Sequence, residues 1–90
     1  MIQRQQLLNY LNQELNVAAI KDYCPNGLQV EGSDTIQHIV TGVTASQRLI
    51  DAVIEKGADT LLVHHGYFWK GEEPTVTGMK RRRLGSLIQH

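Results

Sequence analysis

Apolar positions near the amino terminus recur with a helical period. Four leucines are spaced at one-, three- and four-residue intervals among Gln, Asn and Glu: Leu7, Leu8, Leu11 and Leu15. This spacing predicts an amphipathic helix over residues 3–15, whose leucines are buried against a sheet and whose polar side chains face water.

The next segment alternates between turn residues and short apolar runs. Pro25-Asn26-Gly27 is typical of a turn, because proline fixes φ and Asn-Gly readily takes a positive φ. The four residues Leu28-Gln29-Val30-Glu31 then alternate apolar and polar positions, and Gly32-Ser33-Asp34 turns the chain again. We therefore predict a short edge strand over residues 28–31.

Two β-branched or leucine-rich runs flank a second amphipathic helix. The first run predicts a strand over residues 36–43, and the run Leu61-Leu62-Val63 predicts a strand over residues 60–64. Between them, Thr44 and Gln47 match a capping box, and the apolar face of the helix ends at Gly57. Strand, helix and strand in this order predict parallel neighbours joined by a right-handed crossover.

The fold class is therefore α/β, with a sheet that contains a βαβ unit and is flanked by helices. Thr77 is expected to cap a last helix, whose apolar side consists of Met79, Leu84, Leu87 and Ile88.

Adjacent histidines follow the second predicted core strand directly. His64 and His65 come at its carboxyl end, the edge where open α/β sheets bind ligands, and Gly66 allows a tight turn there. Imidazole is the commonest protein metal ligand, so the pair is a candidate metal site. Because successive side chains of a strand point to opposite sides, two ions about 3.5–4 Å apart fit better than one shared ion. The alternative is a pair of histidines that only form hydrogen bonds at a strand end.

Composition narrows the class of protein. Ninety residues form at most one small domain, and the single cysteine, Cys24, fits a reducing compartment, so we expect a cytoplasmic protein. No run approaches the roughly 20 apolar residues of a membrane span, and residues 1–6 lack the apolar core of a signal peptide. Net charge is zero, but four bases are consecutive at residues 80–83. This basic run is either a solvated helix face or a phosphate contact.

Three ordered blocks resemble one family. They are Pro25-Asn26-Gly27-Leu28-Gln29-Val30-Glu31-Gly32, Val40-Thr41-Gly42-Val43-Thr44-Ala45-Ser46 and Val63-His64-His65-Gly66-Tyr67-Phe68-Trp69-Lys70-Gly71. Together they resemble the NIF-three-like proteins, which are also called GTP cyclohydrolase I type 2 homologues.

The resemblance implies a larger α/β fold, of which residues 1–90 are the amino-terminal part, as a fragment or a truncated reading frame. It also implies a homohexamer and two divalent metal ions in each full-length subunit, with zinc, manganese and iron as candidates. His64 and His65 match the first two metal ligands of the family. The other ligands of the family are expected beyond His90, so this chain holds only half of the metal site.

Two functions remain open on these grounds. One is a metal-dependent hydrolase acting on a nucleotide-like substrate, although no catalytic residue is identified in this chain. The alternative is a metal-binding or protein-interaction module without turnover. A nucleic-acid partner is not expected.

Overall fold

The computed structural model describes residues 1–19, 25–68, 72 and 74–90. Cys24, Trp69, Lys70 and Gly71 lie outside these residues. Within them, no helix is both long enough and apolar enough to cross a bilayer. The elements follow in the order β1 (Ile2–Gln3), α1 (Arg4–Glu14), a 3-10 turn (Val17–Ala19), β2 (Thr35–Ile36), β3 (Ile39–Thr44), α2 (Gln47–Glu55), β4 (Thr60–His65) and α3 (Gly78–Gln89).

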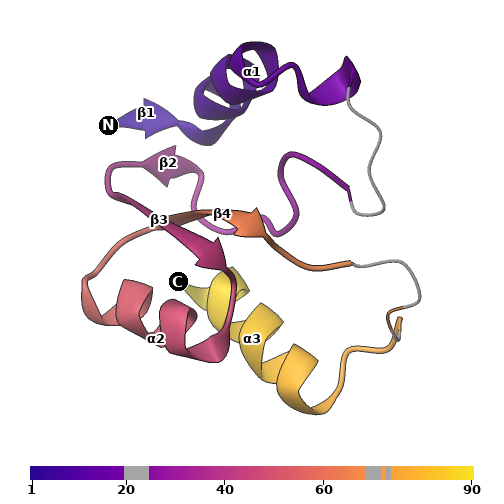
Figure 1. Ribbon diagram of the computed structural model, residues 1–90. Helices are drawn as coiled ribbons and strands as arrows, with labels where there is room; N and C mark the ends of the chain where they lie inside the picture. The colour runs from indigo at the N-terminus through magenta and orange to yellow at the C-terminus, as the bar shows by residue number, and fades with distance from the viewer. Residues whose placement is uncertain (20–24, 69–71, 73) are drawn as a thin grey trace.

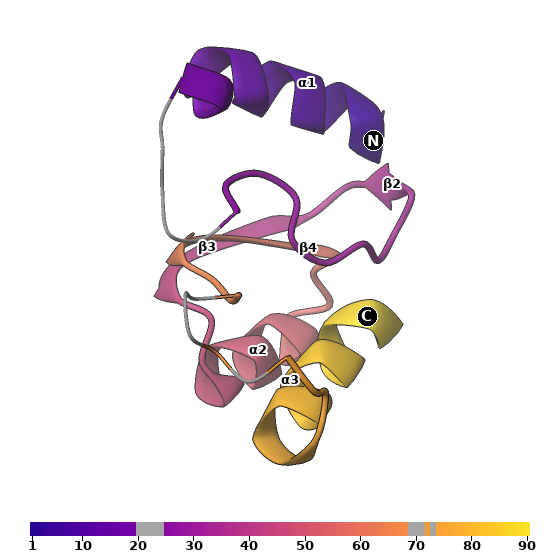
Figure 2. The same ribbon diagram turned by 90° about the vertical axis from the view of Figure 1, so that its right-hand side faces the viewer.

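The strands β3 and β4 form the middle layer of the molecule. Helix α1 lies over one face of this sheet, and α2 and α3 lie side by side on the other face (Figures 1 and 2). The short strands β1 and β2 pair with each other as a separate antiparallel ladder beside α1. The amino- and carboxyl-terminal helices are therefore on opposite sides of the sheet.

The βαβ unit is confirmed. Strands β3 and β4 are parallel, with a register that runs from Ile39 opposite Thr60 to Thr44 opposite His65. The first core strand begins at Ile39 and not at Ile36, because Ile36 pairs with Ile2 in the other ladder. The α/β class and the parallel pairing hold, and the start of the strand is corrected by three residues.

Helix α2 is capped two residues later than predicted. Ser46 is the N-cap residue, and its hydroxyl accepts a 3.2 Å hydrogen bond from the Leu49 backbone N–H. Thr44 cannot serve this role, because it is the last residue of β3 and still belongs to the ladder. The predicted end is right: Gly57 follows the C-cap residue with φ +72°.

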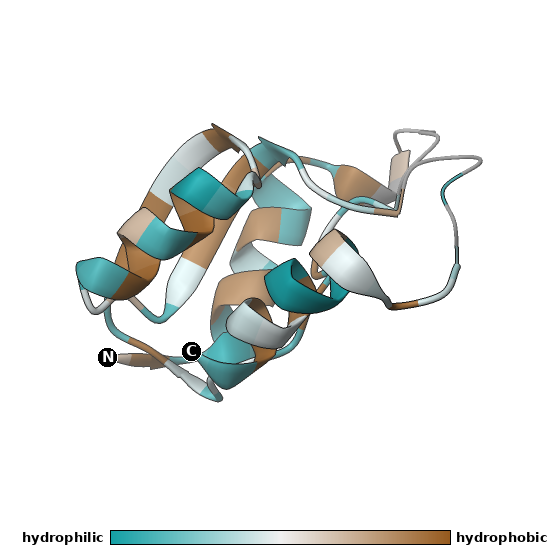
Figure 3. Cartoon of the chain, turned by 90° about the horizontal axis from the view of Figure 1, so that it is seen from below, coloured by the Kyte–Doolittle hydropathy of each residue, from teal (hydrophilic) through white to brown (hydrophobic). Residues whose placement is uncertain are grey.

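A small core lies between α2, α3 and the end of β4. Its buried members come from four separate segments: Ala45, Ile50, Tyr67 and Leu84. Hydrophobic and hydrophilic residues alternate around the helices, as expected for elements with one buried side (Figure 3). The core thus fixes the two helices beneath the carboxyl end of the sheet.

Helix α3 follows its predicted pattern only in part. Thr77 is its N-cap residue, but the hydroxyl of Thr77 makes no capping hydrogen bond. Leu84 is buried and Leu87 packs against the core, whereas Met79 and Ile88 are 54% and 62% exposed. The two exposed residues lie close to the helix ends, beyond the reach of the core.

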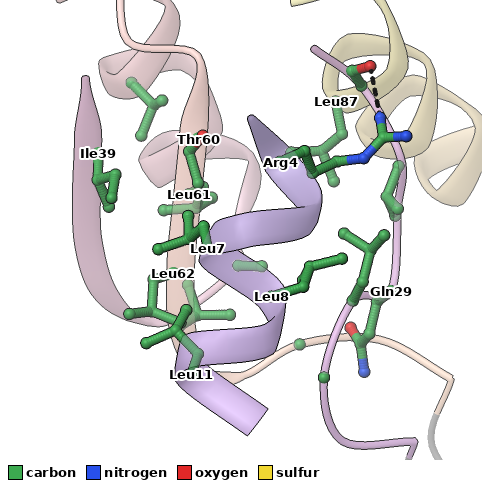
Figure 4. A pocket seen from close by; sticks show the side chains of 18 of the residues that line it. Arg4, Leu7, Leu8, Leu11, Gln29, Ile39, Thr60, Leu61, Leu62 and Leu87 are labelled. Carbon is green, nitrogen blue, oxygen red and sulfur yellow. Dashed lines mark hydrogen bonds between the residues drawn. The ribbon is translucent and has the colours of Figure 1, made fainter. Parts of the chain in front are cut away.

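Helix α1 lies over the sheet but does not pack tightly against it. A cavity of about 730 Å³ lies between the helix and the strands. Leu7, Leu8 and Leu11 extend from α1 into this cavity, Leu7 and Leu11 toward Leu61 and Leu62 of β4 and Leu8 toward the segment that contains Gln29 (Figure 4). The predicted apolar face is therefore correct in direction, but none of the α1 residues is fully buried.

Leu15 is the least buried of the four leucines, although it still lines the cavity. Its side chain is 56% exposed, because α1 ends at Glu14 and Leu15 is the C-cap residue. The predicted edge strand over residues 28–31 is also wrong, since this segment has no strand pairing. Four alternating residues are too few to predict a strand reliably. The side chain of Gln29 instead forms hydrogen bonds with the backbone of Tyr67.

Asp59 joins the start of β4 to the start of β3. Its carboxylate accepts hydrogen bonds from the backbone N–H groups of Gln37 (3.0 Å) and His38 (3.3 Å) and from the Thr60 hydroxyl (3.0 Å). Slight burial raises its pKa, but these hydrogen bonds lower it more, so the pKa lies below its ordinary value of 3.8.

Because the folded pKa of Asp59 is depressed, its contribution to stability is present above the unfolded pKa and is lost as pH falls through the folded pKa. We expect Asp59→Asn to lower the urea midpoint at pH 7 and to make a smaller difference near pH 3. Urea titrations of both proteins at the two pH values measure this. An equal difference at both pH values would show that the carboxylate charge is unimportant.

Candidate metal site

His64 and His65 are the last two residues of β4, as the sequence predicted. The ladder places His65 opposite Thr44, so the pair lies at the carboxyl end of both parallel strands. His64 is exposed and His65 is half-buried. Both histidines are therefore at the rim of the sheet, where they can be reached from solvent.

The two imidazole rings lie beside each other. Their centroids are 4.3 Å apart and the ring planes are inclined by 40°. This corrects the expectation that the two side chains point to opposite sides of the sheet. Burial still alternates between exposed His64 and half-buried His65, so the rings approach each other at the end of the strand, where Thr44–His65 is the last pair of the ladder. Adjacent rings suit a single ion or two neighbouring ions equally well.

The backbone after the histidines is attached to the turn between β3 and α2. The Ala45 N–H donates a 3.0 Å hydrogen bond to the carbonyl oxygen of His65. The buried hydroxyl of Tyr67 donates to the carbonyl oxygen of Ala45. Burial raises the pKa of Tyr67, so its phenol stays protonated as a donor at neutral pH. The end of β4 is thereby tied to the start of α2.

Acidic ligands do not join the histidines in the part of the chain that the structure describes. No group of three or more His, Cys, Asp or Glu side chains gathers there. Asp59 is at the other end of β4, bound to Gln37 and His38, and Glu72 pairs with Lys80 at 3.4 Å. Glu73 lies outside the described residues. Two imidazoles side by side fit the donor chemistry of a metal site, to which they could contribute two ligands.

The basic run at residues 80–83 is not a uniform solvated face. The Lys80 ammonium lies 5.6 Å from the centroid of the Phe68 ring and also pairs with Glu72. Arg81 and Arg82 are exposed, whereas Arg83 is half-buried. One end of the run is therefore part of the packing around the aromatic residues, and the middle faces water.

Gln29 is the site residue that the sequence did not reveal. Its carboxamide contacts the backbone of Tyr67, two residues after His65, although 38 positions separate the two residues along the chain. The block Pro25–Gly32 contributed to the family resemblance, but its pattern predicted a strand. The one signal in the sequence was that Gln29 lies in a block that carries the family resemblance, as His64 and His65 do.

The parallel βαβ core, with a histidine pair at its carboxyl edge, places the chain among the α/β proteins. The chain belongs to the DUF34/NIF3 family: the family model described as Duf34/NIF3 (NGG1p interacting factor 3) matches residues 2–90. The resemblance seen in the three sequence blocks is thus confirmed.

Among its relatives are proteins called GTP cyclohydrolase 1 type 2 homolog. The one from Escherichia coli K12 is 61% identical over 83 residues, which cover 92% of this chain and 34% of the relative. That from Pseudomonas aeruginosa is 58% identical over 84 residues, or 93% of this chain and 33% of the relative. The chain therefore spans about a third of the length of these relatives.

Solved structures show the same backbone. Protein ybgI, described as of unknown function, superimposes with a TM-score of 0.93 at 59% identity, over 97% of this chain and 35% of that chain. A protein from Thermus thermophilus gives a TM-score of 0.90 at 35% identity, over 97% of this chain and 36% of that chain. The fold described above therefore matches about a third of each of these two structures.

Proposed function

We propose that His64 and His65 bind divalent metal and that they provide part of a dinuclear site in the full-length protein. The observation that carries this proposal is the 4.3 Å separation of the two ring centroids at the carboxyl edge of the parallel strands. Neutral imidazole nitrogens are common ligands of zinc and iron, whereas manganese favours oxygen ligands and would depend more on carboxylates. In this proposal, the carboxylates that neutralise the ions come from the two thirds of the relatives' length that this chain does not span.

The proposed activity of the full-length protein is metal-dependent hydrolysis of a nucleotide-like substrate. Paired divalent ions supply Lewis-acid activation of water and polarisation of a substrate oxygen. The names of the relatives support the nucleotide-like class, and the exposed position of His64 supports access for a small molecule. We further propose that the full-length protein assembles as a homohexamer and is located in the cytoplasm.

Removing either histidine should weaken metal binding. We expect wild-type chain to bind zinc only weakly, because two ligands are fewer than the roughly four of a structural zinc site. His64→Ala and His65→Ala should each weaken that binding by about tenfold or more, since loss of even an outer-shell partner costs about 10–100-fold. Calorimetric titration with zinc or manganese at neutral pH measures the affinity, and circular dichroism checks the fold.

His38→Ala is the matched control for these variants. His38 is an exposed histidine at the opposite edge of the same sheet, where its backbone N–H binds Asp59. We expect this variant to bind zinc like wild type. Equal affinities for wild type, His64→Ala and His65→Ala would refute the proposed site. Nanomolar binding of two ions by this chain would refute the claim that it holds only part of the site.

An interaction module without turnover is the alternative function. This alternative assigns His64 and His65 to metal binding alone; within the described residues, no group of three or more His, Cys, Asp or Glu side chains lies together. The two functions can be separated by assaying the longer Escherichia coli relative with metal and nucleotides. Metal-dependent product release that EDTA abolishes supports hydrolysis, whereas metal binding and oligomer formation without product support the interaction module.

A further inference from the structure

The carboxamide of Gln29 binds the backbone just beyond the histidine pair on both of its polar sides. The Tyr67 N–H donates a 2.7 Å hydrogen bond to Gln29 Oε1, and Gln29 Nε2 donates a 3.0 Å bond to the Tyr67 carbonyl oxygen. The amide therefore occupies the place that a neighbouring strand would take beside Tyr67. Nε2 also donates a 3.0 Å bond to the Pro25 carbonyl oxygen, which closes the loop containing Gln29. These three bonds use both amide protons and the oxygen.

The same amide lies directly against Gly66. A Cβ atom built on Gly66 would be 2.2 Å from Gln29 Oε1 and 2.9 Å from Gln29 Cδ. Only glycine leaves room for the amide at this point. Glycine is also the residue with the widest conformational freedom, so the turn after His65 depends on outside contacts to hold one conformation. Gln29 supplies such contacts at the next residue.

The segment from His65 to Tyr67 is held from two directions. On one side, the Ala45 N–H binds the His65 carbonyl oxygen and the Tyr67 hydroxyl binds the Ala45 carbonyl oxygen. On the other side is the carboxamide of Gln29. The first set of contacts comes from within the βαβ unit, whereas the second comes from a loop that carries no regular structure of its own.

We propose that Gln29 is a positioning residue for the histidine pair. By fixing the backbone of Tyr67 it restricts the turn at Gly66 and so holds the two imidazole rings in the side-by-side arrangement. This inference rests on the proposed metal site for its role in binding. The orientation of the rings in metal-free protein can be tested without that proposal.

Gln29→Met is the main test, because methionine is similar in length and removes all three hydrogen bonds. We expect zinc affinity to fall about tenfold, the lower end of the range for outer-shell partners. The His64 and His65 ring resonances should also shift in NMR spectra of the metal-free chain. Gln29→Glu keeps an acceptor for the Tyr67 N–H but puts a carboxylate oxygen against the Pro25 and Tyr67 carbonyl oxygens, so these resonances should shift in this variant too. Gln5→Met is the control, since Gln5 makes its amide contact with Asn9 on the surface of α1.

A folded Gln29→Met chain with wild-type zinc affinity and unchanged histidine resonances would overturn the proposal. If His64→Ala and His65→Ala leave zinc affinity unchanged, the proposed metal site fails, and the metal-free ring resonances still decide the role of Gln29. Hydrogen exchange in the wild-type chain decides the case in which the variants do not fold. The Tyr67 amide should exchange at least about tenfold more slowly than in an unstructured peptide. Exchange at the peptide rate would overturn the proposal that Gln29 fixes the Tyr67 backbone.

Discussion

Replacing Ile50 by alanine is expected to lower the free energy of unfolding by about 2–5 kcal/mol. Ile50 is 1% exposed, and its side chain lies in the cluster with Ala45, Tyr67 and Leu84. Its loss leaves a cavity where α2 meets α3 and the end of β4. A small domain has only about 5–15 kcal/mol of stability in total, so this change removes a large share of it. Urea unfolding followed by circular dichroism measures the difference.

Leu15→Ala is the control for that experiment. The Leu15 side chain is 56% exposed, so its truncation should change the free energy of unfolding by no more than about 0.5 kcal/mol. A loss of less than about 1 kcal/mol for Ile50→Ala would contradict the packing of α2 against Tyr67 and Leu84. Equal losses in the free energy of unfolding for Ile50→Ala and Leu15→Ala would show that the difference in burial between the two side chains has no effect on stability.

Gly42→Ala should also destabilise the chain, by about 1–3 kcal/mol. A Cβ atom at residue 42 of β3 would be 2.4 Å from Leu49 Cδ2 and 3.2 Å from Leu49 Cδ1. The strand cannot retreat easily, because Gly42 is paired with Val63 in the middle of the ladder. Leu49 in α2 has to move, which disturbs the contact of that helix with the sheet. Thermal and urea unfolding both report the loss.

The same substitution at Gly85 should have the opposite sign. Gly85 lies within α3, and a Cβ atom there would meet nothing within 4 Å. Alanine is favoured over glycine in a helix by up to about 1 kcal/mol, so Gly85→Ala should stabilise the chain. Both substitutions reduce the entropy of the unfolded chain in the same way, so their difference reflects the two folded environments, the contact with Leu49 in β3 and the open helical position in α3. Stabilisation by both would show that this contact does not restrict β3.

The βαβ unit could be predicted because its information is local. Two apolar runs, a helical period between them and Gly57 at the helix end are each visible within a short stretch of sequence. The separate ladder of β1 and β2 was not predicted, because two residues in each strand are too few to show an alternating pattern. The start of β3 was misplaced for the same reason, since Ile36 resembles its neighbours but pairs with Ile2.

The candidate site could be predicted in position but not in geometry. The order of apolar run, histidines and glycine places His64 and His65 at the carboxyl edge of the sheet. The contact of the two rings depends on how the strand ends, and the contribution of Gln29 depends on a contact across 38 residues. No local pattern contains such a contact. Gln29 takes part in three side-chain hydrogen bonds within a segment whose alternation predicts a strand.

The middle layer has a further consequence for the behaviour of the chain in concentrated solution. In the described residues, β3 and β4 pair only with each other, so each presents one edge without a neighbouring strand. Open edges carry rows of N–H and C=O groups that can recruit a strand from another molecule. Ile39, Val43 and Leu62 on these strands are 42%, 65% and 39% exposed, so exposed apolar side chains lie on the strands that carry these open edges. We therefore expect chains to associate edge to edge into extended sheets, and a lysine at Val43 to oppose this association.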